Sequence, residues 1–513
     1  MKKLATLLLA AGLVLGAATG ASAIDFKAKG EWLVTFDYGQ NGNFSGGNGR
    51  TGSGYGDGDE FEAGQRFRIS LDAVASESLS GQLFFEIGGG KWGNDGAGYA
   101  VGADRTNTIK LRRAFIDWMV PQTDLKFRMG LQAIALPSFT TQTQIFNEDV
   151  AGVTASLKIN DNVGLTAVWA RPYNDNATDA GVGHLNRANY MDNVDAFALL
   201  VPLSFDGVKV TPWVMYAAIG PNWNATASTP VGTSYSRVTG GLLPAGGARH
   251  KDGSNASNAR NLSSYGDAWW AGLTGDITAF DPFRIAWDFN YGSVNWSDDG
   301  RLNRHGWLAS LLFEYKLDWG IPGLYGWYAS GDDSDPANGS ERMPSVSTNN
   351  TNNQFSDFAM NGAPWDHSRE GVLSDNMTGT WGIGVRLKDV TFVEDLKHTL
   401  WLNYMGGTNS PTMAKKMSRN DIYNNGWNRN PNQGRGMGYD PLYMTTGDSA
   451  LEIGLRNVYQ MYENFQIYFE GAYIATWLDH SRSVWGRSVM NGAGGSDQER
   501  DPWNINLSFV YSF

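Results

Sequence analysis

Residues 503–513 read WNINLSFVYSF, and apolar and polar side chains alternate along them. Only Val510 interrupts the alternation. Because successive side chains of a β-strand point to opposite faces, this segment would have one polar face and one apolar, largely aromatic face. The apolar face consists of Trp503, Ile505, Leu507, Phe509, Tyr511 and Phe513. Such a strand is typical of a membrane barrel that contacts lipid outside and encloses water.

The same two-residue period recurs through the rest of the chain. It is clear in residues 26–38, and in residues 66–72 and 82–87 on either side of a short turn. Further segments of this kind are 113–118, 125–132, 283–291, 307–317, 381–388, 399–404, 451–456 and 465–473. No segment shows the 3.6-residue period of a helix with comparable regularity. The pattern therefore predicts an all-β chain.

Short and long connections alternate between these segments. The short connections lie at 161–162, 206–207, 280–282, 318–320, 394–395 and 462–464. The long ones, rich in Gly, Asn, Ser and Asp, lie at 39–63, 219–265, 331–378, 408–447 and 479–502. This sorting is typical of short periplasmic turns and long outer loops. We expect a transmembrane antiparallel up-and-down β-barrel of about 18 strands, or 16 if the segment 136–149 divides one strand.

The N-terminal segment has the order of a secretory signal. Lys2 and Lys3 precede an apolar run, residues 4–18, and Ala21-Ser22-Ala23 follows as a small-residue cleavage site. The alternative, a membrane-anchoring helix, needs ~20 apolar residues. We expect a signal peptide at 1–23 and a single barrel domain at 24–513. Removal of the two lysines would take the formal net charge from −12 to −14.

Composition is consistent with export and membrane insertion. After residue 23 no apolar run is long enough for a spanning helix, so insertion would require a closed barrel, which pairs every backbone group. The 64 glycines suit long loops and the 13% aromatic content suits two interfacial girdles. There is no cysteine, so stability cannot come from disulfides. We expect no nucleic-acid partner.

The predicted strand number indicates a broad function. Barrels of ~16 to 18 strands leave an aqueous channel. The predicted inward faces are polar and charged, which indicates a water-filled lumen. These features predict a cell outer-membrane porin in contact with outer-membrane lipid, rather than an enzyme. No G-x-S-x-G motif indicates hydrolase chemistry.

Residues 112–118 (RRAFIDW), residues 127–132 (FRMGLQ) and the closing strand carry a family resemblance. The chain resembles the trimeric bacterial outer-membrane porins, most closely the homotrimeric outer-membrane porin family of sulfate-reducing bacteria, over its whole length. The resemblance implies a homotrimer with three parallel pores that pass small hydrophilic solutes and ions by passive diffusion. It also implies that the third outer loop, residues 136–149, folds inward, so that Glu148 and Asp149 face arginines across the narrowest point.

Charged side chains on the predicted inward face are the candidate selectivity residues. The cationic ones are Arg66, Arg68, Arg113 and Arg128. The anionic ones are Asp72, Glu86 and Asp117. The arginines form a basic ladder on one wall, or they pair with the carboxylates and stiffen that wall; the two interpretations are compatible. A dominant ladder would favour anions such as sulfate, and dominant loop carboxylates would favour cations.

Other interpretations stay open. The barrel could be a substrate-specific channel for an oxyanion or a sugar, or an anchor for a surface adhesin or receptor, and conductance separates these classes. No cofactor is expected. The acidic loop segments 56–60 and 331–335 have the oxygen density that calcium prefers, but neither has the EF-hand spacing, and such loops are usually only solvated.

Overall fold

The protein is described by a computed structural model. The residues that the structure describes are 24–41, 60–93, 99–101, 109–174, 193–220, 241–244, 247–254, 256, 264–346, 355–356, 358–360, 373, 377–419, 443–479 and 499–513. The predicted signal segment, 1–23, lies outside them.

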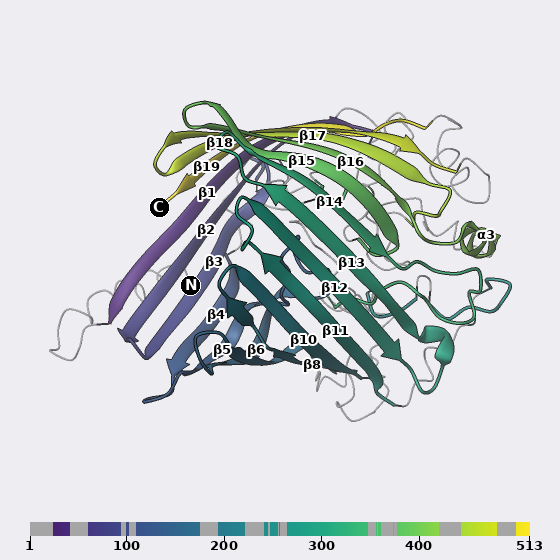
Figure 1. The fold of residues 1–513 in the computed structure, drawn as a ribbon, viewed down its shortest axis with the longest axis horizontal. Coiled ribbons are helices and arrows are strands. Elements are labelled where there is room, and N and C mark those ends of the chain that lie inside the picture. Colours follow the sequence, from purple (N-terminus) through teal and green to yellow (C-terminus); the bar gives the residue numbers. More distant parts are fainter. Residues whose placement is uncertain are drawn as a thin grey trace.

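The described residues form one antiparallel sheet (Figure 1). Its strands are β1 (Asp25–Gln40), β2 (Glu60–Ser76), β3 (Leu79–Lys91), β4 (Ile109–Met119), β5 (Leu125–Ala135), β6 (Asn147–Lys158), β7 (Gly164–Asn174), β8 (Asn193–Leu200), β9 (Leu203–Phe205), β10 (Val208–Ile219), β11 (Gly266–Ile277), β12 (Phe283–Asn295), β13 (Arg304–Tyr315), β14 (Ile321–Ala329), β15 (Thr380–Val393), β16 (Leu396–Gly407), β17 (Ser449–Tyr462), β18 (Phe465–Trp477) and β19 (Trp503–Ser512).

The sheet closes on itself. Strand β1 pairs with β2 on one side and with β19 on the other, so no edge is left at this seam. The short strand β9 continues β8, and both pair with β10, so together they occupy one position in the wall. The barrel therefore has 18 positions, which confirms the prediction of 18 strands over the alternative of 16.

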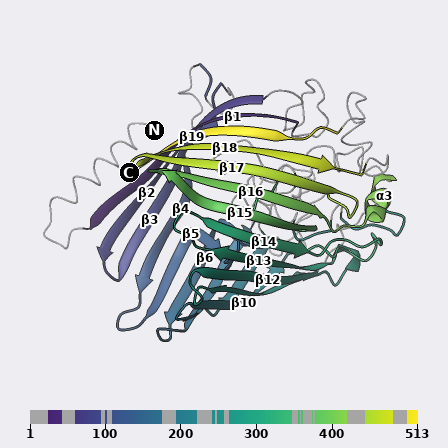
Figure 2. The same ribbon diagram turned by 45° about the horizontal axis from the view of Figure 1, so that its top comes forward.

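The connections sort by length between the two ends of the barrel, as predicted. Turns such as 206–207 and 394–395 join strands at one end, and long connections such as 330–379 join them at the other. Among the described residues, the connection between β12 and β13 contains a short 3-10 helix, η4 (Gly300–Leu302), and the long connection between β16 and β17 contains a short α-helix, α3 (Pro411–Arg419). Figure 2 shows α3 at the long-loop end, opposite the C-terminus. The sequence pattern did not reveal α3. No described helix is long and apolar enough to span a membrane.

Side chains alternate between the two faces of the wall. On β12, Phe289 and Tyr291 are 48% and 43% exposed, whereas the intervening Asn290 is buried. On β13, Leu311 and Phe313 are exposed in the same way, and Leu312 between them is buried. The side chains exposed on the outer face are thus apolar, as the period-two pattern predicts for a surface that contacts lipid.

The C-terminal residue covers the closing seam. Phe513 exchanges backbone hydrogen bonds with Gly30 of β1, at 2.8 and 3.0 Å. Its ring lies over Gly30 so closely that a Cβ added there would be 2.3 Å from the ring. The same ring is stacked on Phe67 of β2, with centroids 6.2 Å apart. Glycine at position 30 therefore lets the last residue lie across β1 and contact β2.

Gly30→Val is expected to displace the Phe513 ring and destabilise the folded barrel by about 1–3 kcal/mol, the usual cost of overpacking. The measurement is the temperature at which the heat-dependent change in electrophoretic mobility occurs. Gly81→Val is the matched control on β3, because a Cβ there would meet only ordinary contacts, the nearest at 3.5 Å. Equal behaviour of the two variants would contradict this account of the seam.

Candidate pore constriction

The connection between β5 and β6, residues 136–146, folds into the barrel. Its two ends are joined by a hydrogen bond from Leu136 N to Phe146 O, at 3.0 Å. Its tip reaches β12 and β13, which are far from β5 in the order of the wall. At both ends and along its length the loop carries buried side chains, including Leu136, Ile145 and Phe146. The inward loop that the family resemblance implied is thus present, although it ends at residue 146.

A single carboxylate holds the tip of this loop. Asp288 of β12 is 3% exposed and accepts hydrogen bonds from the backbone N–H groups of Phe139 and Thr140, at 3.0 and 3.1 Å. The hydroxyls of Ser138, Thr140 and Thr274 donate to the same carboxylate. Hydrogen bonds to a charged acceptor are stronger than those between neutral groups. Asp288 therefore anchors the tip of this loop to β12.

Part of the long connection between β14 and β15 also folds inward. Glu452 of β17 is fully buried and accepts hydrogen bonds from Phe358 N and Ala359 N, at 2.7 and 3.1 Å. Asn403 Nδ2 of β16 donates to the other oxygen of Glu452, at 2.8 Å. Tyr325 of β14 donates to Phe355 O, at 2.9 Å. The second inward segment is thus fixed to the wall in the same way as the first, by hydrogen bonds from its backbone N–H groups to a buried carboxylate.

The two inward segments contact each other within the barrel. Val346 N donates to Ile145 O at 2.9 Å, and Met377 N donates to the side-chain oxygen of Gln144 at 3.1 Å. Buried aromatic side chains on the inner faces of β10 to β16 belong to the same packed interior. They are Trp213, Trp270, Tyr325, Trp327 and Trp401. The inner face of this half of the barrel is therefore largely packed.

The inner face of β2 to β5 is different, because it is charged and partly solvated. The side chains of Arg68, Arg112 and Arg113 are 26%, 32% and 33% exposed, and those of Lys126 and Arg128 are 43% and 37% exposed. These arginine and lysine side chains therefore keep contact with solvent on the inner wall.

The predicted arginine–carboxylate pairs form in two cases. Arg68 donates to Glu86 at 2.9 Å, and Arg128 makes a two-point contact with Asp117 at 2.7 and 2.8 Å. In each pair the two side chains therefore lie on the same face of the wall. The guanidinium groups are paired with carboxylates and still partly exposed. This arrangement is compatible with both interpretations given above, a basic ladder and structural pairs that stiffen the wall.

The remaining predicted residues of β2 pair differently from the prediction. Arg66 donates to Glu31 of β1 at 3.1 Å, an acceptor that the alternation alone did not identify as its partner. Asp72 accepts hydrogen bonds from Gln82 at 2.7 Å and from Ser70 at 3.3 Å, rather than from an arginine. The register explains this, because β2 places Asp72 directly opposite Gln82 of β3.

The structure places Glu148 and Asp149 in strand β6 and not in the inward loop, so the expected loop boundary was wrong. Asp149 also does not face the arginines across a gap. Its carboxylate contacts Arg113 at 2.6 Å and Arg112 at 2.6 and 2.8 Å. Glu148 lies beside it, opposite Ile134 of β5. The physical reason is that β5 and β6 continue their pairing to Ala135 and Asn147, whereas β5 pairs with β4 only as far as Leu131.

Arg112 is a site residue that the alternation missed. Strict period two assigns Arg112 to the outer face, next to the inward Arg113. An irregularity in the β3–β4 register, between Phe84 and Phe85, inserts one extra residue in β4. Both arginines can then reach Asp149, and Arg112 also lies 3.5 Å from Glu86. The only sequence signal was the adjacent pair of arginines itself, which a bulge can place on one face.

The charges on this wall do not balance locally. Around Glu86 and Asp149 lie four cationic side chains, Arg68, Lys110, Arg112 and Arg113, so this cluster has an excess of two positive charges. Around Asp117 lie Lys126 and Arg128, an excess of one. Aromatic rings support the guanidinium groups: Arg113 lies 5.2 Å from the Phe84 ring and Arg128 lies 4.1 Å from the Phe115 ring.

The acidic segment 331–335 uses its carboxylates within the loop. Asp332 is buried and accepts hydrogen bonds from Ser340, Tyr443 and the backbone of Glu341. Asp333 accepts from the backbone of Asp335 at 2.6 Å. Within the part of the chain that the structure describes, no group of three or more His, Cys, Asp or Glu side chains is arranged to hold a metal ion. Residues 56–59 of the other acidic segment lie outside the described residues.

One loop carboxyl has an unusual pKa. Burial, reinforced by the neighbouring carboxylates of Asp332 and Asp333, raises the pKa of Glu341 to about 7 from the ordinary 4.5. Because the folded state holds this proton to higher pH than an unfolded chain does, the contribution of Glu341 to stability falls as the pH rises from 4.5 to 7. Glu341 also accepts a hydrogen bond from Asp333 N at 3.0 Å.

Glu341→Gln is expected to raise the Tm at pH 8 by about 2 °C and to leave it unchanged at pH 4. The amide keeps an acceptor for Asp333 N–H but cannot ionise. Thermal unfolding of the detergent-solubilised protein at the two pH values measures the effect. Glu463→Gln, in a short turn, is the matched control. A shift of the same size at both pH values would show that charge on Glu341 is not its cause.

No protein-family model matches this sequence, and no curated protein matches it either. Solved structures of Pseudomonas aeruginosa outer-membrane channels share its fold. OccK9 (OpdG) has a TM-score of 0.50 at 10% identity, with 95% of this chain and 99% of that chain covered. OpdO has a TM-score of 0.48 at 13% identity, covering 95% and 97%. OccK2 (OpdF), in complex with glucuronate, has a TM-score of 0.48 at 11% identity, covering 95% and 98%.

At these identities the comparison establishes the fold alone. The chain is a closed, 18-stranded antiparallel β-barrel of the type found in bacterial outer-membrane channels.

Proposed function

We propose that this protein is an outer-membrane porin: a water-filled channel for passive diffusion of small hydrophilic solutes and ions. The observation that carries the proposal is the partly solvated charged wall of β2 to β5 beside two inward loops. A barrel that served only as an anchor for surface loops has no need of solvated charges on its inner wall. The inward loops set the size limit of the passage, and the wall sets its charge preference.

The lumen is proposed to favour anions, such as sulfate. The two clusters on β2 to β6 have an excess of positive charge, although the whole chain is acidic. Selectivity depends on the charges nearest the narrow part of a channel more than on distant ones, because water and salt screen the field within about 8–10 Å. The residues proposed to set this preference are Arg66, Arg68, Arg112, Arg113 and Arg128 with their carboxylate partners.

Membrane insertion is supported by two belts of exposed aromatic side chains. At the short-turn end these are Phe205, Phe280, Trp319, Phe392 and Tyr462. Towards the long-loop end they are Trp269, Tyr328, Tyr404, Trp477 and Tyr473. Aromatic residues prefer the two interfaces of a bilayer. We propose that residues 1–23 direct export and are removed, and that the barrel lies in the outer membrane.

We further propose a homotrimer, the assembly implied by the resemblance to the porins of sulfate-reducing bacteria. Light scattering of the detergent-solubilised protein would then give a protein mass of three chains. A mass of one chain would contradict the trimer and leave the channel proposal intact, since each barrel encloses its own passage.

Swelling of liposomes that contain the purified barrel tests the channel directly. Arabinose, a small uncharged sugar, is expected to enter and cause swelling, whereas a large dextran is not. A barrel that acts as a closed surface anchor would admit neither solute, and that result would contradict the proposal.

A further inference from the structure

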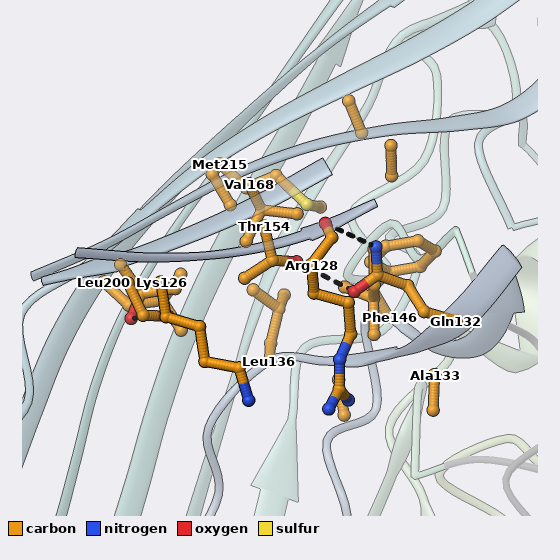
Figure 3. Close-up of a pocket in the computed structure, with 17 residues that line it drawn as sticks. Lys126, Arg128, Gln132, Ala133, Leu136, Phe146, Thr154, Val168, Leu200 and Met215 are labelled. Atoms are coloured by element: carbon orange, nitrogen blue, oxygen red, sulfur yellow. Dashed lines mark hydrogen bonds between the residues drawn. The ribbon is translucent and has the colours of Figure 1, made fainter. Parts of the chain in front are cut away.

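A pocket of about 240 Å³ lies on the inner wall beside the base of the inward loop (Figure 3). It is formed by the inner faces of β5, β6, β7, β8 and β10, together with Leu136 and Phe146 from the two ends of the loop. The loop is fixed at its tip by Asp288, so these two side chains have a stable position at the pocket. The volume suits a small solute rather than a drug-sized one.

The pocket exists because the wall carries small side chains at this point. Ala170 of β7 lies opposite Ala196 of β8, and Val168 lies opposite Ala198. On the other side of β8, Ala198 lies opposite Met215 of β10. Elsewhere the inner face of β10 carries a large aromatic, Trp213. Together with Leu136 and Phe146, these residues give the pocket an apolar floor and side.

Apart from Lys126 and Arg128, the polar side chains of the pocket are neutral and hydrogen-bonded. Gln132 accepts a hydrogen bond from Thr154 at 3.1 Å and donates to Gly152 O at 2.9 Å. Ser156 and Thr166 share a hydrogen bond of 3.2 Å. No acidic side chain is among the residues that line the pocket. The recess therefore presents apolar surface and hydroxyl groups, but no negative charge.

Two cations lie at the edge of the pocket. Lys126 Nζ and Arg128 Nη2 are 2.9 and 2.8 Å from the same oxygen of Asp117, so the two cations share one carboxylate. In Figure 3 their charged ends extend away from Thr154, Val168 and Met215. Both side chains keep contact with solvent, and one positive charge stays uncompensated within this group of three.

We propose that this pocket is a solute-binding site for a small amphipathic monoanion: a compact anionic group with a short alkyl or aromatic body. The anionic group binds Lys126 and Arg128, and the apolar body enters the recess between Leu136 and Ala198. The assignment rests on the proposed channel function and names a class of solute for it. The single excess charge matches a monoanion, and the apolar floor gives no partner to a fully hydroxylated sugar.

The binding site has a consequence for transport. A solute that occupies the pocket lies beside the positively charged wall, so its residence time in the channel is long. While it is bound, it reduces the flow of small ions past Arg128. Passage of such a solute is therefore saturable, in contrast to the linear flux expected for solutes that do not bind.

Titration of benzoate against the ion current of single channels tests the proposal. Benzoate has both an anionic group and an apolar body, acetate lacks the body, and benzyl alcohol lacks the charge. Benzoate is expected to block the current with a dissociation constant at least about tenfold lower than that of either analogue. Equal block by all three probes, or no block by benzoate, would overturn the proposal.

Two variants locate the site. Ala198→Leu fills the recess and is expected to weaken block by benzoate at least about tenfold while the current without benzoate persists. Ala151→Leu places the same substitution on the exposed, opposite face of β6 and serves as the control. If Ala198→Leu fails to fold, Ala196→Val takes its place. Unchanged block in a folded, recess-filling variant would place the benzoate site elsewhere.

Calorimetric titration of the detergent-solubilised barrel with benzoate separates the two proposals. Absence of any channel current would contradict the proposed channel function. Heat of binding that Ala198→Leu abolishes would still support a benzoate-binding site in the pocket. Normal current without heat of binding would contradict the proposed binding site but not the proposed channel function.

Discussion

Asp288→Ala is expected to release the inward loop and widen the channel. The substitution removes the acceptor for two backbone N–H groups and for the hydroxyls of Ser138, Thr140 and Thr274. Hydrogen bonds to a charged acceptor contribute about 1.5–3 kcal/mol, and the buried N–H groups left without one add a further penalty. A loss of about 3 kcal/mol raises the population of the undocked loop roughly a hundredfold.

Single-channel recording measures this effect as a rise in conductance and in current fluctuations. Asp288→Asn is expected to have a smaller effect, because the amide oxygen still accepts a hydrogen bond. Asp206→Asn, in an exposed short turn, is the matched control and should leave the conductance unchanged. Unaltered conductance in a folded Asp288→Ala barrel would show that residues 136–146 do not limit the passage.

The double substitution Arg112→Gln and Arg113→Gln is expected to shift ion selectivity towards cations. It removes the excess of two positive charges from the cluster around Glu86 and Asp149. A unit charge ~4 Å from an ion in water contributes about 1 kcal/mol. A difference of this size changes an equilibrium roughly fivefold, and two such charges change the permeability ratio further.

The reversal potential in a salt gradient measures the shift. Arg301→Gln is the control, because Arg301 lies in η4 and is paired with Asp299 at 2.8 Å, outside the wall of β2 to β5. If the double variant and the control had the same reversal potential, the arginines would be structural only, and selectivity would depend on other groups.

The fold could be predicted because a barrel wall repeats one local rule. Successive residues of each strand point alternately outward and inward, the outward ones are largely apolar, and residues 503–513 show this pattern in a single segment. The prediction that Arg68 and Glu86 share the inner face follows from the same rule applied to two paired strands. The division between 16 and 18 strands depended on the segment 136–149, where the period is weak.

The details of the constriction depend on departures from that rule. The bulge that places both Arg112 and Arg113 near Asp149 breaks the alternation by one residue, and only the adjacent pair of arginines hints at it in the sequence. The anchor between Thr140 and Asp288 joins positions that are 148 residues apart, so local pattern carries no information about it. The family resemblance, and not the periodicity, indicated that residues 136–149 fold inward.

The packed half of the barrel was also beyond the sequence pattern. Inward aromatics such as Trp213 and Trp327 break the polar inner face, yet they read as ordinary strand residues until the loops that cover them are placed. The tip of the inward loop reaches β12 and β13, on the opposite side of the barrel from the charged wall of β2 to β5. The position of the proposed passage therefore depends on loop packing, which the strand pattern does not encode.

The reversal potential of the unmodified protein in planar bilayers, measured across a tenfold gradient of potassium chloride, tests the central claim most directly. The account predicts stepwise conductance, with a reversal potential whose sign shows that chloride is more permeant than potassium. A cation-selective reversal potential would contradict the role of the arginine wall, and absence of conductance would contradict the channel itself.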